Sequence, residues 1–491
     1  MSFIDGTAVN VALPILQADL HASAADVQWV VEGYALFLSA LILIGGSLGD
    51  IFGRRLMFGC GIALFALASL TCAFAPNAIV LVAARCLQGV GGALATPGSL
   101  ALISGAFEGE ARGRAIGLWS GFASIAGAGG PVIGGFLAQH FSWRYVFLLN
   151  LPFALIVIVI LVFRVEETRD ENDPRVVDWT GAVLATIGLG ALVYALIGFQ
   201  SGRFEPRSIL TAVIGVFTLV AFVLYEKRAR VPMMPLDTFG SRIFSMTNIY
   251  TFVLYAALGG SLYFVPFTLI DVQHYTPTAA GAVLLPLVLI QFVASPWSGG
   301  LLARIGPRIP LAIGALGAAG GFALFARPGI GGSYWTTYFP AVLVLGIGVA
   351  LFVAPLTTTV MDSIDKSRSG LASGINNAVA RTAGLIAVAA LGIVLSAVFA
   401  DGFSARISQA HVSAQTQAIA QNDRSKLTAG TVPPDIPVQD RPAVLVAIQE
   451  GYLAGFRAVM FVSAALCVFA ALLAWAFIPA TPRKVPGVGH T

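Results

Sequence analysis

The sequence predicts an all-α polytopic membrane protein with fourteen transmembrane segments. Its 491 residues are 57% hydrophobic and only 11% charged, whereas charged residues make up about 25% of a soluble globular chain. Apolar runs follow one another along the whole chain, and many reach the roughly 20 residues that a helix needs to cross a bilayer core of about 30 Å. These runs do not alternate between apolar and polar residues, so helices are expected rather than barrel strands.

The expected spans are the apolar runs between short polar turns, and each boundary is uncertain by a few residues. They lie near 3–17, 27–47, 57–75, 78–104, 114–138, 143–163, 177–199, 207–225, 244–270, 277–301, 308–326, 334–360, 370–399 and 452–478.

The distribution of Lys and Arg predicts the orientation. With the N-terminus inside the cell, 17 of the 28 basic residues lie in inner loops and eight lie outside. Half of those eight fall in one long loop, where the positive-inside rule carries little weight. The remaining three, Arg85, Arg381 and Arg457, fall within spans. A multi-pass protein of the plasma (cytoplasmic) membrane with both termini in the cytoplasm is therefore expected.

A repeated loop divides the chain into two related halves. GGSLGDIFGRR ends at Arg55, and a weaker copy, SGGLLARIGPR, ends at Arg308. The offset of 253 residues between these arginines also separates Gly46 from Gly299 and Gly53 from Gly306.

The expected domains follow from this repeat. Residues 1–163 form an N-terminal six-helix bundle, 164–243 a linker with two extra transmembrane helices, and 244–491 a C-terminal six-helix bundle with a long outer loop at about 400–450. The loop is either a solvated connector or a gate or partner-binding flap, and an amphipathic helix is expected within it from Ser404 to Lys426.

The first span is short for a membrane helix. Met1 leaves about 16 residues before it ends, or roughly 24 Å at 1.5 Å per residue. Either this helix enters the membrane late, or the chain as given begins inside the original helix. The second interpretation predicts an in-frame upstream start that adds about a dozen apolar residues.

Charged residues inside spans mark candidate functional positions, because burying a charge in the membrane costs about 2.5–3.5 kcal/mol on insertion scales. Asp5 lies in the first span, in FIDGTAVNVALP. A carboxyl group that binds and releases a proton near physiological pH is what proton coupling requires. The alternative is that Asp5 lies at the interface of a short helix and has no such role.

A second candidate group lies in the fourth span. Arg85 and Gln88 are one helical turn apart in ARCLQGVGGAL, so they share a face. A buried Arg should meet a carboxylate, a helix carbonyl end or water. Arg85 could also serve only to hold helices together.

Further polar residues suggest a substrate cavity, with Asn10, Gln88, Glu32 and Asp271 as its candidate residues. Glu32 and Asp271 lie at the outer ends of their spans. They are interpreted either as solvated acids at helix ends or as acids that attract cations in an outward-facing vestibule.

The span at 114–138 contains a dense set of glycines, in which Gly130 and Gly134 have GxxxG spacing and Pro131 breaks the local hydrogen-bond ladder. Gly135 follows directly. Close helix packing and a moving hinge explain this pattern equally well.

Several function classes lack the motifs they need. The sequence contains no GxxxxGK[ST] loop for ATP, no HExxH or Cys/His cluster for a metal, and no GxSxG elbow. No enzyme activity, cofactor, metal or nucleic-acid partner is therefore expected. Any transport by this chain is therefore expected to draw its energy from a gradient across the membrane.

Four motifs together resemble those of the major facilitator superfamily, specifically its fourteen-helix drug:proton antiporter branch (EmrB/QacA-type). FIDGTAVNVALP at 3–14 resembles the helix 1 signature, and 46–55 resembles the loop 2–3 motif. Residues 85–92 resemble the helix 4 motif RxxQGxGgA, and GPVIGG at 130–135 resembles the helix 5 antiporter motif.

The resemblance implies two six-helix bundles plus two inserted helices, with alternating access around a central cavity. Asp5 would be a protonation site and Arg85 its partner. Asp50, with Arg54 and Arg55, would form an inner gate in which Gly46 and Gly53 permit tight turns. The antiporter motif Gly130, Pro131, Gly134 and Gly135 would prevent leakage.

Two departures weaken the gate. Ile51 stands where the loop motif usually has Arg, and Ala303 stands where the second copy usually has an acid.

The predicted function is proton-coupled efflux, by antiport, of small amphipathic or lipophilic compounds, with the breadth of a multidrug transporter. The partners are then a small-molecule substrate, protons and the lipid bilayer, and a functional monomer is expected. The alternative is a dedicated exporter of one metabolite or self-made antibiotic. A membrane-embedded sensor or enzyme is a third hypothesis.

Overall fold

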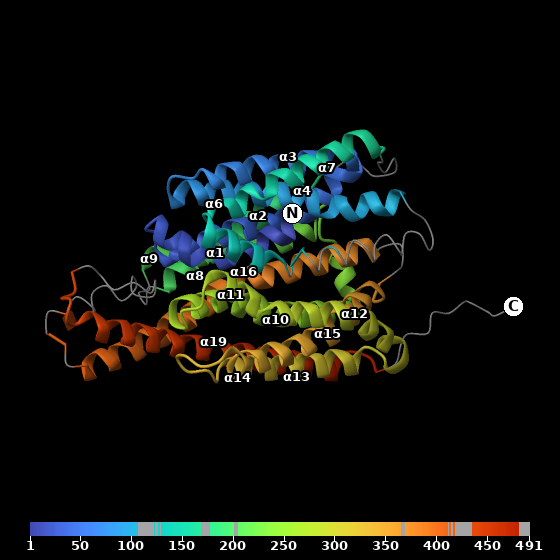
Figure 1. Ribbon diagram of the computed structural model, residues 1–491. Coiled ribbons are helices and arrows are strands. Elements are labelled where there is room, and N and C mark those ends of the chain that lie inside the picture. Colours follow the sequence, from blue (N-terminus) through green and yellow to red (C-terminus); the bar gives the residue numbers. More distant parts are fainter. Residues whose placement is uncertain are drawn as a thin grey trace.

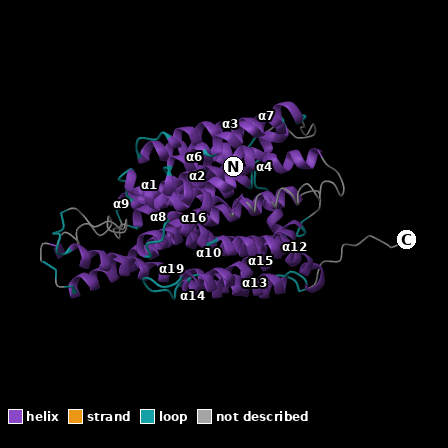
Figure 2. Ribbon diagram, viewed as in Figure 1, coloured by secondary structure: helices purple, strands orange, loops and turns teal. Residues whose placement is uncertain are grey.

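A computed structural model describes residues 1–106, 122, 126–127, 129–167, 177–200, 205–364, 369–410, 412–413, 416–417 and 435–480. Within these ranges every regular element is a helix (Figure 2). Most helices run side by side along one direction, and those of the first third of the chain lie above those of the last half in the view of Figure 1.

The first group of helices extends from the N-terminus to Arg164. Its members are α1 (Ser2–Asp19), α2 (Ala24–Phe52), α3 (Arg54–Ala73), α4 (Ala78–Ala106), helical residues 129–140, α6 (Arg144–Leu148) and α7 (Asn150–Arg164). Both α2 and α3 pack along α4, and α3 also contacts α7.

The next two helices, α8 (Trp179–Phe199) and α9 (Pro206–Glu226), pack against each other. Besides α9, α8 contacts both α2 and the later helix α16. Leu36 of α2, Val193 of α8 and Leu385 of α16 belong to one buried apolar cluster there. The pair thus touches helices from both ends of the chain.

The remaining helices repeat the packing of the first group, because α13 and α12 pack along α15 as α3 and α2 pack along α4. They are the 3-10 helix η1 (Leu236–Gly240), α10 (Arg242–Phe267), the π-helical turn η2 (Thr268–Val272), α11 (Pro277–Val283), α12 (Leu285–Ile305), α13 (Arg308–Phe325), α14 (Tyr334–Thr337), α15 (Phe339–Met361), α16 (Ser369–Gln409) and α19 (Arg441–Phe477).

Twelve helical segments of the described residues are long and apolar enough to cross a membrane. They correspond to the expected spans except 3–17 and 114–138. The first exception is α1, which carries two acidic side chains, Asp5 and Asp19, and two amide side chains, Asn10 and Gln17, in 18 residues. Much of the second lies outside the described residues.

The segment at 400–450, expected as an outer loop, is helical at both of its ends, since α16 continues to Gln409 and α19 already begins at Arg441. Phe399, Phe403 and Ile407 recur every four residues on α16 and are buried. This apolar stripe lets α16 pack against α19 as a two-helix hairpin beyond the length of a bilayer span. Part of the amphipathic helix expected from Ser404 is thus the end of α16, and residues 418–434 lie outside the described residues.

The hairpin ends in a hydrogen-bonded turn. Thr416 Oγ1 and Ser413 Oγ both donate to Asp440 Oδ2, at 2.6 and 2.9 Å. These bonds, first from Thr416 and then from Ser413, lower the pKa of Asp440. At the base of the hairpin, a cavity of about 360 Å³ is lined by residues that include Arg406, Glu450 and Arg457, and by none of the predicted site residues.

Candidate functional site

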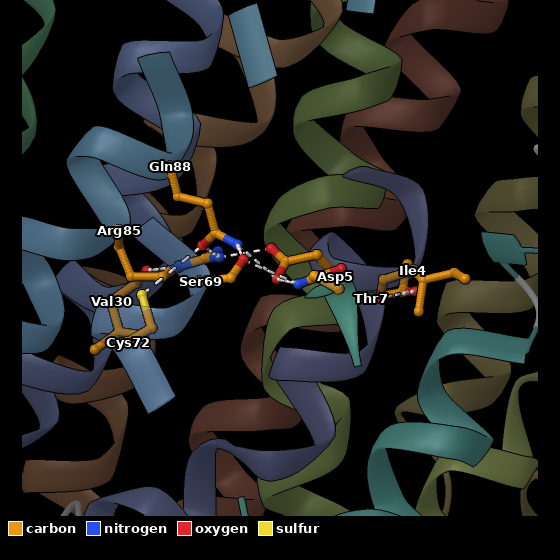
Figure 3. A network of polar contacts seen from close by, with 9 residues as sticks. Ile4, Asp5, Thr7, Val30, Ser69, Cys72, Arg85 and Gln88 are labelled. Atoms are coloured by element: carbon orange, nitrogen blue, oxygen red, sulfur yellow. Dashed lines mark hydrogen bonds and ion pairs between the residues drawn. The ribbon is translucent and has the colours of Figure 1, made fainter. Parts of the chain in front are cut away.

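Asp5 lies at the centre of a buried polar network (Figure 3). Its residue is 1% exposed, and Arg85 of α4 is equally buried. Arg85 Nη1 donates to Asp5 Oδ2 at 2.6 Å, which forms a buried ion pair between α1 and α4. The structure therefore brings together the two residues that the sequence suggested as partners. Their role in proton coupling stays a prediction.

Arg85 is held by more than the carboxylate. Its Nε donates to the carbonyl oxygen of Val30 at 2.9 Å. Its guanidinium carbon lies 4.3 Å from the ring centroid of Tyr34 and 5.8 Å from that of Phe147. Such cation–π contacts stabilise a desolvated guanidinium. The positive charge of Arg85 is therefore compensated by the Asp5 carboxylate, a backbone carbonyl oxygen and two aromatic rings.

Gln88 belongs to the same network. It is fully buried, and its Nε2 donates to Asp5 Oδ1 at 3.0 Å and to Ser69 Oγ at 2.7 Å. Its Oε1 accepts from Arg85 Nη1 at 2.5 Å. The residue expected in the substrate cavity thus positions the ion pair instead of contributing open surface.

Asn150 and Ser69 complete the network and were not found from the sequence. Asn150 Nδ2 donates to Asp5 Oδ1 at 2.9 Å and to Ser69 Oγ at 3.3 Å. A signal was present, because Asn150 is the polar residue within the apolar run FLLNLP that begins α7. Asp5 accordingly accepts hydrogen bonds from three donors on α4 and α7.

Asn10 lies on another face of α1. Asn10 and Thr7 keep partial exposure, whereas Ala8 and Val9 are buried. Asn10 Oδ1 is a buried atom without a hydrogen-bond partner among the described residues. Of the expected cavity residues on α1, Asn10 is thus separate from the Asp5 network.

The two expected vestibule acids lie in environments that differ from each other. Glu32 of α2 is 1% exposed, and neither of its carboxylate oxygens has a partner among the described residues. Its interpretation as a solvated acid at a helix end is therefore wrong, because the residue lies in the third turn of α2 and Tyr263 of α10 is nearby. Asp271, in η2, is partly buried close to Tyr452 of α19.

The loop motif between α2 and α3 is anchored by a residue outside the motif. Gly53 has φ +115°, and a Cβ there would lie 2.6 Å from Glu167 Cδ. Glu167 accepts from the backbone N–H groups of Arg55 and Leu56 at 2.9 and 3.0 Å. An acidic side chain at the first turn of a helix also interacts favourably with the helix dipole. Arg55 Nη2 donates to the carbonyl oxygen of Val162 at 3.1 Å.

The other residues expected in the gate lie in α2 and α3. The tight turn expected at Gly46 is wrong, because this residue lies inside the continuous helix α2, where a Cβ would lie 3.7 Å from Pro97 of α4. Asp50 also lies in α2, but its side chain lies outside the described part. Arg54 is the first residue of α3.

The GPVIGG motif makes two close helix contacts. A Cβ at Gly134 would lie 2.5 Å from the carbonyl oxygen of Ala8, and Gly130 meets Thr7 of the same helix α1. Gly135 instead faces α11, where a Cβ would clash with the carbonyl oxygen of Pro277. Close packing thus accounts for these three glycines.

Pro131 belongs to the second contact. Its carbonyl oxygen would clash with a Cβ at Gly281 of α11. A hydrogen bond from Thr278 Oγ1 to Gln139 Oε1, at 2.7 Å, lies beside this contact.

Comparison with known proteins identifies the family. The model of the Major Facilitator Superfamily matches residues 1–389. The chain belongs to the major facilitator superfamily. It is similar to the multidrug resistance protein Stp of Mycobacterium tuberculosis, with 33% identity over 98% of this chain and 90% of that protein. It is also similar to the tetracenomycin C resistance and export protein of Streptomyces glaucescens, with 32% identity over 96% of this chain and 88% of that protein.

Solved structures agree in fold. A bacterial homologue of the human lysosomal transporter Spinster, in an inward-facing and occupied conformation, superposes with a TM-score of 0.62 and 15% identity over 96% of this chain and 93% of that chain. The chain is thus a multi-pass membrane transporter rather than an enzyme, as the sequence predicted. The resemblance to the drug-resistance branch is confirmed by the full-length relatives.

Proposed function

We propose that this transporter exports amphipathic, drug-like small molecules from the cell in exchange for protons. The observation that carries the proposal is the ion pair between Asp5 and Arg85, both buried in the transmembrane region. Burying a charge within a membrane span costs free energy, so charged residues at such positions are candidates for a functional role. The names of the relatives, a multidrug resistance protein and an antibiotic export protein, support efflux as the direction.

The network suggests how a proton would act. A proton that binds Asp5 removes the negative charge that faces Arg85 and occupies an oxygen that now accepts hydrogen bonds. Arg85 then needs another counter-charge, and Gln88 and Asn150 lose an acceptor. Since these residues join α1 to α4 and α7, protonation would loosen α1 from its neighbours. Movement of helices around a central site is the alternating access of this class of transporter.

The close contacts of the GPVIGG glycines support a transporter that can close at its outer end. With both termini in the cytoplasm, the packing of residues 129–140 on α1 and α11 lies toward the outer surface. Gly135 and Gly281 allow the backbones from the two halves to touch there. Larger side chains at these positions would keep the halves apart. The motif would therefore prevent protons and solutes from leaking through the closed outer side.

The membrane organisation follows the same proposal. Fourteen segments result when α1 and the segment around 114–138 are added to the twelve helices that are long and apolar enough. Residues 1–163 and 244–491 would form the two bundles, with α8 and α9 inserted between them. The excess of Lys and Arg in the inner loops supports cytoplasmic termini in the plasma membrane. The protein would work as a monomer.

A dedicated exporter of one compound is the second candidate. It is favoured by two relatives named for single antibiotics, the tetracenomycin C exporter and the puromycin resistance protein of Streptomyces alboniger. Resistance to several unrelated lipophilic compounds would support the multidrug function. Resistance to one chemical series would support the dedicated one.

The test is efflux in everted membrane vesicles with an acidic lumen. We expect them to accumulate a lipophilic fluorescent dye, and to lose it when an uncoupler collapses the gradient. Asp5→Asn should reduce accumulation to the level of vesicles without the protein. The matched control is Asp19→Asn on the same helix, since Asp19 is half exposed and pairs with Arg144.

Two results would contradict proton coupling through Asp5. One is full accumulation by Asp5→Asn. The other is accumulation by the unaltered protein that is indifferent to the uncoupler.

A further inference from the structure

Arg381 of α16 is a charged residue that the structure leaves without a counter-ion. It lies twelve residues into a helix that crosses the membrane region. Its Nε is buried without a hydrogen-bond partner, and its guanidinium makes no hydrogen bond or ion pair with another described residue. Arg85, in contrast, has Asp5. A cation within a membrane span is costly unless something compensates it.

The surroundings of Arg381 place it on the inner side of α16. Tyr34 of α2 and Tyr255 of α10 are its neighbours. These two helices come from the two halves of the chain, and α16 packs against both. In Figure 1 the orange ribbon of α16 lies between the blue helices and the green to yellow ones. The side chain therefore lies at the boundary between the halves and not toward lipid.

Arg381 is also part of a polar stripe. Ser373, Asn377 and Arg381 are spaced four residues apart, so they share one face of α16. Each keeps accessible surface, and Asn377 is exposed. Polar side chains within a span face the bundle interior or a water-filled space. The stripe thus places accessible polar groups on the same face of α16 as Arg381.

Neighbouring phenol groups limit what can compensate Arg381. A tyrosine offers a ring face and a hydroxyl oxygen, but no negative charge at neutral pH. Arg381 retains donors in a planar fork that suits two oxygens of an anion. A ligand with an acidic oxygen group would supply the missing charge, and its aromatic part would lie against Tyr255.

We propose that Arg381 binds an acidic oxygen group, such as a carboxylate or phenolate, on the exported compound. This inference rests on the proposed export function and names the class of substrate: aromatic amphiphiles that carry an acidic oxygen. Arg381 then determines specificity, while Asp5 and Arg85 couple transport to protons.

The test compares two dyes that differ in one group. Rhodamine B carries a free carboxylate, and its ethyl ester lacks it. Binding to the purified full-length protein in detergent is measured by fluorescence anisotropy, which requires no gradient. We expect the unaltered protein to bind rhodamine B more tightly than the ester. Arg381→Gln should weaken rhodamine B binding by about tenfold or more, as expected for loss of a hydrogen bond to a charged group, and should leave ester binding unchanged.

Two variants serve as controls. Arg381→Lys keeps the charge and should retain a preference for rhodamine B, which separates recognition from a folding defect. Arg406→Gln, also on α16, alters an arginine that is already paired with Glu450. It should not change the affinity for either dye.

Equal affinity of the unaltered protein for the two dyes would overturn the inference. So would an equal loss for both dyes in Arg381→Gln. Unchanged binding in Arg381→Gln, with gradient-driven efflux of both dyes lost, would also overturn it and would assign Arg381 to coupling, with the export function intact. Conversely, the dyes could bind as expected while efflux does not depend on the gradient. That result would contradict the proposed function, whereas the binding site at Arg381 would stand.

Discussion

The two halves share a backbone plan but differ in charge, and the repeated loop shows this most directly. Gly53 and its counterpart Gly306 both have positive φ, +115° and +71°. Arg55 donates to the carbonyl oxygen of Val162 near the end of α7, and Arg308 donates to that of Ile478 at the end of α19. The turn and the arginine contact are thus repeated.

The acid that anchors the loop is not repeated. Glu167 accepts from the first N–H groups of α3. No described acidic residue accepts from the corresponding groups at the start of α13. Ala303 had already suggested a loop with fewer charges in the second half.

The polar cores differ in the same way. In the first half Asp5 and Arg85 form an ion pair. In the second, Asn376 Nδ2 donates to Asn248 Oδ1 at 3.2 Å and to Thr251 Oγ1 at 2.7 Å, without a charge. A neutral network holds helices together but does not respond to a single proton. If transport is coupled to protons as proposed, the proton-sensitive step is expected in the first half.

The largest loss of stability is expected when only one partner of the Asp5–Arg85 ion pair is replaced. Arg85→Gln leaves the Asp5 carboxylate without a cation, and we expect it to lower the free energy of unfolding by about 3–5 kcal/mol. Asn376→Ala removes neutral hydrogen bonds from the other half and should cost about 1–3 kcal/mol. Unfolding of the purified variants in one detergent measures both.

Similar losses in these two variants would contradict the contrast between a charged and a neutral core. The double variant Asp5→Asn, Arg85→Gln sharpens it. Because neither charge remains, stability should largely return while gradient-driven transport stays absent.

A smaller effect is expected from the two loop glycines. Alanine in a left-handed conformation costs about 1–2 kcal/mol, so both Gly53→Ala and Gly306→Ala should destabilise the protein. Gly53→Ala should cost more, because the new Cβ would lie 2.6 Å from Glu167 Cδ and displace the anchor. Thermal unfolding of the pair measures the difference, and a greater loss in Gly306→Ala would refute this explanation.

The smallest effect concerns the charge of the anchor. Glu167→Gln keeps the shape and removes the charge at the start of α3, which should cost about 0.3–1 kcal/mol. High salt should reduce the difference, since exposed charges are screened. Glu166→Gln, at an exposed neighbouring position, is the control and should have no effect. A loss of the same size in the control would show that the contact with α3 is not responsible.

Much of the plan was readable from the sequence, because membrane insertion imposes long apolar spans and the repeat preserves turn geometry. Twelve expected spans have counterparts among the helices, and the paired glycines both adopt positive φ. The pairing of Arg85 with Asp5 also follows from the cost of an isolated intramembrane charge.

What the sequence could not provide was the direction of each side chain. Gln88 and Asn10 looked alike as cavity candidates, but one faces Asp5 and the other faces away from it. The contact between Glu167 and Arg55 could not be predicted from a local pattern, because the two residues are 112 positions apart in the sequence. Such choices depend on how helices rotate against each other, and local pattern does not determine that rotation.

The long hairpin of α16 and α19 has a mechanical consequence. A continuous helix of 41 residues spans about 60 Å, roughly twice the thickness of the hydrocarbon core. Because both helices are also part of the membrane bundle, the hairpin is a lever attached to it. A small rotation of that bundle would move the tip farther than any residue inside the bilayer. A spectroscopic label at Val438, which is 76% exposed near the tip, would therefore report the motion with the greatest amplitude.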